Sequence, residues 1–112
     1  MSVRLEFKPD FEDAQKHWLA FWEQELLDRP CCVIRAPKAG VEAVPPGAPY
    51  MSGARDEFGP VIDRILANAA ATWYGGDAVP AYTPSFGPDM FAAWLGAELE
   101  FDDSGFGTNW VV

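Results

Sequence analysis

Apolar side chains recur at intervals of three and four residues between Phe11 and Leu27, and this spacing predicts an amphipathic helix. Asp10 precedes the first apolar residue and is a good N-cap, and two further acidic residues follow in the first turn, where the helix dipole favours negative charge. Arg29-Pro30 marks the end of the helical region, because proline disfavours helical geometry in the residue before it. We interpret the apolar stripe, which is rich in Trp and Phe, as a packing face.

The segment Cys31–Ile34 is short and apolar, which predicts a buried strand that leads to Arg35 and a turn at Pro37. Neighbouring side chains in a strand point to opposite faces, so the two adjacent cysteines are poorly placed to bond each other or to share a metal. We interpret them as two small buried thiols. Between Gly40 and Gly59 the chain is rich in Pro, Gly and Ala, which predicts a long loop, and long loops in compact domains are usually functional.

The second half of the chain again alternates helical and extended patterns. We predict a helix that begins near Asp56 or Pro60, has an apolar side reaching Trp73, and is closed by Gly75-Gly76. Further elements are predicted in order: a strand at Ala78–Thr83, a short helix at Asp89–Leu95 stopped by Gly96, and a strand at Glu98–Phe101. Strands that alternate with helices predict a parallel α/β arrangement.

Composition limits the classes of protein to which the chain can belong. Its 112 residues are one domain at most, and its 49% hydrophobic and 22% charged residues are typical of a globular protein. The net charge of −9 disfavours nucleic acid as a partner, because such affinity comes largely from Lys and Arg. The longest apolar runs are far shorter than the about 20 residues that span a membrane, and Met1–Asp10 lacks the apolar core of a secretory signal. We therefore expect a cytoplasmic protein without nucleic-acid or membrane partners.

Three segments carry a resemblance to a known family. Arg29–Lys38 resembles the first barrel strand of uroporphyrinogen decarboxylases, which opens with Arg-Pro, continues through four mostly apolar residues and enters an Arg-Gln-Ala-Gly-Arg loop; Arg29, Pro30 and Arg35 fall in register. Gly87–Phe101 is similar to the family's helix, glycine and Glu-Phe strand, and Thr108-Asn109-Trp110 resembles the segment that follows in its less characterised decarboxylase-like branch.

The resemblance implies an α/β fold in which residues 1–28 form an N-terminal helical segment. Residues 29–112 would form the first strands and helices of an incomplete (β/α)₈ TIM-type barrel, since a complete one needs about 250 residues. The implied activity is that of a lyase of the decarboxylase type or of a methyltransferase, acting on a tetrapyrrole such as a porphyrin, a corrinoid or another small anionic molecule. Without the C-terminal half of the barrel, we expect this piece to be inactive alone. Thr83–Phe86 lacks the aspartate that true decarboxylases carry there, which points away from uroporphyrinogen itself.

Arg35 is the leading candidate for substrate binding. It follows an apolar strand, so a barrel would place it at the C-terminal mouth, where a guanidinium can clamp a carboxylate through two hydrogen bonds. Lys38 and Tyr82 are further substrate-binding candidates. His17, Cys31 and Cys32 lack zinc-ligand spacing, so we predict no metal site. We also predict no resident cofactor, and the sequence identifies no catalytic residue. We interpret the remaining polar candidates as structural or solvent-exposed: His17, Tyr50, Ser85, Asp89, Glu98, Glu100, Asp102, Asp103 and Ser104.

A second class of function stays open. The chain would then be a small non-enzymatic binding or interaction module, a homo-oligomer that pairs its open sheet edges and covers its Trp-rich faces. A third reading is a gene fragment with no activity.

Overall fold

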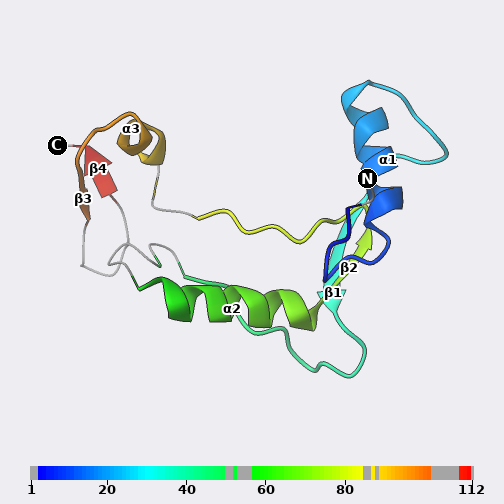
Figure 1. Cartoon of the computed structure of the whole chain (residues 1–112), viewed down its shortest axis with the longest axis horizontal. Helices are drawn as coiled ribbons and strands as arrows, with labels where there is room; N and C mark the ends of the chain where they lie inside the picture. Colours follow the sequence, from blue (N-terminus) through cyan, green and yellow to red (C-terminus); the bar gives the residue numbers. More distant parts are fainter. Residues whose placement is uncertain are drawn as a thin grey trace. The chain divides into compact units, whose positions relative to one another are not determined.

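The computed structural model describes residues 3–49, 52, 57–84, 87, 89–101 and 109–111 (Figure 1). The chain forms two compact units: the first unit comprises Met1–Pro45 and Leu66–Ala81, and the second unit comprises Pro46–Ile65 and Tyr82–Val112. Residues 1–28 therefore share a unit with the Arg29–Lys38 segment. The elements in chain order are α1 (Phe11–Trp22), β1 (Val33–Pro37), α2 (Phe58–Ala71), β2 (Thr72–Gly76), α3 (Met90–Trp94), β3 (Leu99–Phe101) and β4 (Asn109–Val111).

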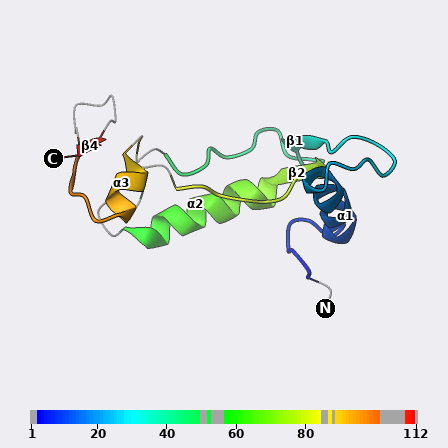
Figure 2. The ribbon, with the colours of Figure 1, turned by 90° about the horizontal axis from the view of Figure 1, so that it is seen from above.

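In the first unit, α1 lies beside a two-stranded sheet made of β1 and β2 (Figures 1 and 2). The two strands are antiparallel, and their register places Arg35 opposite Tyr74 and Val33 opposite Gly76. The core between these elements is small and consists mainly of short side chains, namely Ala14, Ala20, Ala69, Tyr74 and Ala78.

Helix α1 begins where the apolar spacing predicts but ends at Trp22, five residues before the predicted end near Leu27. Gln24 has a φ of 59°, in the left-handed region that ends helices. The N–H of Gln24 donates to the carbonyl of Phe21 at 3.2 Å, and the N–H of Glu25 donates to the carbonyl of Ala20 at 2.8 Å. These two bonds form a Schellman motif, which caps the helix before the apolar spacing in the sequence ends.

Helix α2 ends at Ala71, and Thr72–Gly76 is a strand. The prediction that Trp73 continues the helix and that Gly75-Gly76 closes it is therefore wrong, as is the predicted strand at Ala78–Thr83, where the structure shows no strand. Thr72 to Tyr74 are β-branched or aromatic, and such residues favour strands. Pro80 lacks the N–H that a strand needs for its ladder, which explains why the strand lies before it.

The predicted parallel arrangement is wrong for the described strands, because both β1–β2 and β3–β4 are antiparallel. A parallel pair needs a crossover that returns the chain to the beginning of the first strand. Here β2 starts directly at the end of α2, and the N–H of Lys38, just after β1, donates to the carbonyl of Ala71 at 2.9 Å. The chain therefore enters β2 beside the end of β1.

The predicted buried strand is also more open than expected. Val33 is 52% exposed and Ile34 45% exposed, and the two cysteines precede β1 with Cys31 half-buried and Cys32 exposed. Tyr74 and Thr72 on the facing strand are buried, so the described residues cover one strand of the sheet and leave most of the other in solvent. These helices and strands are compatible with the α/β class, and the TIM-type barrel stays a prediction.

The second unit contains the short helix α3 and the β3–β4 pair (Figure 1). The predicted helix before Gly96 is confirmed: Gly96 has a φ of 96° and its N–H donates to the carbonyl of Ala93 at 2.9 Å. The predicted strand at the Glu98–Phe101 segment is confirmed as β3, which pairs with the unpredicted strand β4.

Candidate functional site

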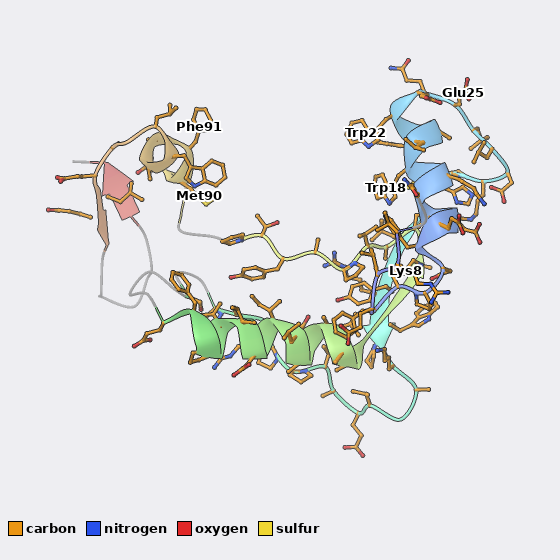
Figure 3. The ribbon with its side chains drawn as sticks, in the orientation of Figure 1. Lys8, Trp18, Trp22, Glu25, Met90 and Phe91 are labelled. Atoms are coloured by element: carbon orange, nitrogen blue, oxygen red, sulfur yellow. The ribbon has the colours of Figure 1, made fainter. Side chains whose placement is uncertain are left out.

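An open groove of about 550 Å³ lies in the first unit along the aromatic stripe of α1. Trp18 and Trp22 project from the same side of the helix (Figure 3). Trp22 is 75% exposed, and the ring of Phe21 stacks edge-on against both tryptophans. We call this the aromatic groove; it is lined by Phe11, Gln15, Trp18, Leu19, Trp22, Val33, Arg35, Val79 and Ala81.

Arg35 is the only charged residue among the described residues that line the aromatic groove. Its position in β1, opposite Tyr74, places its guanidinium carbon 5.9 Å from the centre of the buried tyrosine ring. A cation at this distance from an aromatic face is held by the ring quadrupole. Within the part of the chain that the structure describes, no carboxylate lies within 4.0 Å of Arg35.

A second polar feature of the first unit centres on Asp77, whose side chain is buried. Its Oδ1 accepts a hydrogen bond from Nη2 of Arg29 at 2.9 Å, and its Oδ2 accepts from Nη1 of the same residue and from the N–H of Cys32 at 2.8 Å. The pKa of Asp77 lies well below its ordinary value, chiefly because the guanidinium of Arg29 donates to the carboxylate. The same pair raises the pKa of Arg29.

His17 extends this network, which corrects its interpretation as a helix-surface residue. Its side chain is only 13% exposed and lies between two carboxylates, with Nε2 at 2.7 Å from Oδ1 of Asp28 and Nδ1 at 3.0 Å from Oδ1 of Asp77. The hydrogen bond to His17 lowers the pKa of Asp28. Trp18 adds a hydrogen bond from its indole N–H to the carbonyl of Asp77 at 2.7 Å. We call His17, Asp28, Arg29 and Asp77 the Asp77 cluster.

Lys8 is the most deeply buried cation among the described residues, at 1% exposed. Its ammonium donates to the carbonyl of Tyr74 at 2.9 Å, to the carbonyl of Gly76 at 2.7 Å and to Oδ2 of Asp10 at 3.0 Å. These bonds match the three donors of the ammonium. Asp10 therefore precedes α1 as predicted, but its carboxylate pairs with Lys8 and makes no side-chain hydrogen bond to the helix. Figure 3 shows Lys8 beside the β1–β2 pair.

The other two predicted binding residues, Lys38 and Tyr82, are not among the residues that line the aromatic groove. The ammonium of Lys38 donates to the carbonyl of Ala70 at 2.6 Å, at the C-terminal end of α2, and lies 5.6 Å from the centre of the Phe7 ring. A cation at a helix C-terminus is favoured by the exposed carbonyls, which gives Lys38 a structural contact. Tyr82 belongs to the second unit, in an extended segment, and is 38% exposed.

The remaining polar candidates either lie at the short elements of the second unit or fall outside the described residues. Asp89 precedes α3 without a side-chain capping bond, and Glu98 and Glu100 flank or lie in β3. No group of three His, Cys, Asp or Glu side chains suited to a metal ion occurs among the described residues. Burial raises the pKa of the Cys31 thiol, with the Asp77 carboxylate adding to the shift. Outside the described residues lie Tyr50, Ser85, Asp102, Asp103 and Ser104.

Comparison with models of protein families, with curated proteins and with solved structures gives no match. The resemblance to uroporphyrinogen decarboxylase-like proteins therefore stays a prediction. None of the described helices combines the length and the apolar character that crossing a bilayer requires.

Sequence reasoning missed Asp77 and Lys8, which link the segments of the first unit. The signal for Asp77 was its place directly after Gly75-Gly76, where an acid follows a pair of conformationally permissive residues. Gly76 has a φ of 58° and leaves no room for a Cβ beside the carbonyl of Cys32, so this glycine lets the chain turn Asp77 toward Arg29. The signal for Lys8 was weaker, because an isolated lysine near a chain end is usually solvated.

Proposed function

We propose that the aromatic groove binds a largely apolar small molecule that carries a carboxylate, and that Arg35 is the residue that fixes the carboxylate. The observation that carries this proposal is the position of Arg35 as the single charged side chain among the described residues lining an aromatic groove. A guanidinium forms two parallel hydrogen bonds with a carboxylate, and indole rings supply a large flat apolar surface.

The size and the chemistry of the groove support this proposal. Its volume of about 550 Å³ lies in the range of about 300–1,000 Å³ usual for small-molecule sites, which are mostly apolar with a few polar groups that fix orientation. The position of the Arg35 guanidinium over the Tyr74 ring limits its conformational freedom before a ligand arrives. Less side-chain freedom is then lost on binding.

The resemblance in Arg29–Lys38 gives this binding role a biochemical setting. We propose that the chain supplies part of the substrate site of a cytoplasmic uroporphyrinogen decarboxylase-like enzyme, of the decarboxylase or methyltransferase type. Its substrate would be a tetrapyrrole, a corrinoid or another small anionic molecule. Under this proposal Arg35 binds substrate, and no described residue of the groove is assigned a proton-transfer step.

Calorimetric titration with 2-naphthoate and its uncharged analogue 2-naphthamide tests the binding role. We expect Arg35→Gln to weaken naphthoate binding at least about tenfold, the loss of one charge-assisted interaction, and to leave naphthamide binding unchanged. Arg64→Gln is the matched control, because Arg64 is an exposed arginine that does not line the groove. Equal naphthoate affinities for Arg35→Gln and Arg64→Gln would contradict the proposal. A carboxylated porphyrin in the same titration tests the tetrapyrrole expectation.

A second candidate function is a homo-oligomeric interaction module. It is favoured by the exposure of large apolar side chains on both units, since such surfaces mark sites of protein association. The most exposed of these side chains are Trp22 (75%), Phe91 (68%), Trp94 (72%) and Leu95 (76%).

A further inference from the structure

The hydrogen bonds at both ends of the β1–β2 pair show which backbone groups face outward. Cys32 and Asp77 extend the β1–β2 register by one pair, and the N–H of Asp77 donates to the carbonyl of Cys32 at 2.6 Å. At the other end, the N–H of Lys38 donates to the carbonyl of Ala71 at 2.9 Å. Hydrogen-bonded pairs alternate with non-bonded pairs in an antiparallel ladder. The even-numbered residues of β1 therefore bond to β2, and the N–H and carbonyl groups of Val33 and Arg35 point away from it.

The outer edge of β2 is already covered. Tyr74 and Gly76 are the partners of Arg35 and Val33 in the register, so their carbonyls also point outward, and both accept hydrogen bonds from the ammonium of Lys8. Buried lysine donors at a strand edge occupy the acceptors that an added strand would use.

The outer edge of β1 has no such cover. Within the described part of the chain, the outward backbone groups of Val33 and Arg35 have no hydrogen-bond partner, and β1 pairs with β2 alone. Their side chains line the aromatic groove beside Trp18 and Trp22. An open strand edge thus borders an apolar groove that carries one positive charge. Extended peptides bind to other proteins through this combination: the backbone adds a strand, and alternate side chains enter a groove.

We propose that the outer edge of β1 binds an extended segment of another polypeptide, with apolar side chains at alternate positions and a carboxylate side chain facing Arg35. Charge selects this occupant. A second copy that paired edge to edge through its own β1 would bring a second Arg35 to the same ladder. Like charges close together across a ladder are destabilising, whereas an acidic strand is complementary to Arg35. This proposal shares Arg35 and the aromatic groove with the proposed function, and it adds the outward backbone groups of β1, which small-molecule binding does not need.

The test uses the full chain and a fluorescein-labelled heptapeptide with blocked ends, in which Val and Thr alternate around a central Glu. Val33→Pro removes one outward N–H and leaves the inward bonds of Ile34 and Ala36 in place, since proline is tolerated at a strand edge. Val33→Thr keeps the N–H and nearly the same shape, so it is the matched control. We expect Val33→Pro to weaken peptide binding at least about tenfold relative to Val33→Thr, and Arg35→Gln or a peptide with central Lys to weaken it by a similar factor.

A second measurement keeps the proposal testable if Val33→Pro does not fold. The same peptide with alternate amides N-methylated has the same side chains but cannot complete a ladder, and we expect the wild-type chain to bind it at least about tenfold more weakly. Equal affinities for the methylated and unmethylated peptides would overturn the proposal. A wild-type chain that dimerises and in that form excludes the peptide would overturn it in favour of a second copy. Naphthoate binding by the wild-type chain is measured separately, so equal affinities for the two peptides would overturn this proposal without bearing on the proposed function.

Discussion

Asp77 shows how one buried carboxylate can organise several segments. Its side chain bonds to Arg29 and to the backbone of Cys32, it lies within ion-pair distance of His17, and its carbonyl accepts the indole N–H of Trp18. A buried charge is stable only when it is paired and its remaining lone pairs are occupied, and both conditions hold here. The carboxylate therefore stabilises the fold only while it is ionised.

We expect Asp77→Asn to lower the free energy of unfolding at pH 7 by roughly 2 kcal/mol, because the amide cannot accept both hydrogen bonds of the Arg29 guanidinium, while water solvates part of the 39% exposed Arg29 side chain. The pKa of Asp77 in the folded chain lies below its ordinary value of 3.8, so its stabilising contribution is fully present above that value and is lost as the pH falls below it. The difference between wild type and variant should thus narrow between about pH 5 and pH 2.

Urea unfolding followed by tryptophan fluorescence at several pH values measures this difference. Asp63→Asn is a control that removes an exposed carboxylate from α2. A gap between wild type and Asp77→Asn that stays constant as the pH falls would show that the ionised carboxylate is not the source of the stability.

At the scale of elements, the two described helix ends with Schellman bonding differ in one residue. Helix α3 has Gly96 at its left-handed position, and helix α1 has Gln24 there. A side chain in this backbone conformation is strained by contact between its Cβ and the following carbonyl, and glycine avoids that contact. The apolar pattern continues past Trp22, so it did not predict that α1 ends there. The capping hydrogen bonds that end the helix depend on backbone conformation and not on apolar spacing.

We expect Gln24→Gly to raise the free energy of unfolding by about 0.5–1 kcal/mol, since it relieves the strain and removes a side chain that is exposed to solvent. The greater flexibility of glycine in the unfolded chain offsets part of the gain. Gln24→Ala keeps the Cβ and should give no such gain, which makes it the control in urea unfolding. Stabilisation by alanine as large as that by glycine would contradict the strain argument.

Short-range sequence signals predicted those element ends that depend only on nearby residues. The start of α1 followed from apolar spacing, and the end of α3 followed from Gly96. The position of β2 did not, because the helical pattern reached Trp73 while pairing with β1 across some 40 residues drew Thr72–Gly76 into a strand. The Asp77 cluster was equally hidden, since Arg29 and Asp77 are 48 residues apart in the chain. Arg35 was a candidate because it follows the predicted apolar strand; the structure places it within β1, and its binding role stays a prediction.

At the scale of the whole molecule, apolar exposure and negative charge act in opposite directions. Large exposed side chains such as Trp22 and Trp94 favour association between copies, and a net charge of −9 opposes it through repulsion. Salt weakens the repulsion because it shortens the distance over which exposed charges interact, to about 10 Å at 0.1 M.

We expect the chain to associate more strongly as salt rises, with a larger average mass in sedimentation velocity at about 0.5 M salt than at about 0.02 M. Trp22→Gln should reduce this association if the aromatic groove contributes to the contact, and Trp94→Gln tests the second unit in the same way. An unchanged monomer mass across this salt range would rule out the homo-oligomeric module at the concentration used.

The buried ammonium of Lys8 has a consequence for synthesis of the chain. Its acceptors on Tyr74 and Gly76 lie 66 and 68 residues further along the sequence. The ribosome therefore synthesises Lys8 long before the residues whose carbonyls accept its hydrogen bonds. During that interval the ammonium stays hydrated in the nascent polypeptide. The N-terminal segment is made first, but Lys8 can form these hydrogen bonds only after translation has passed residue 76.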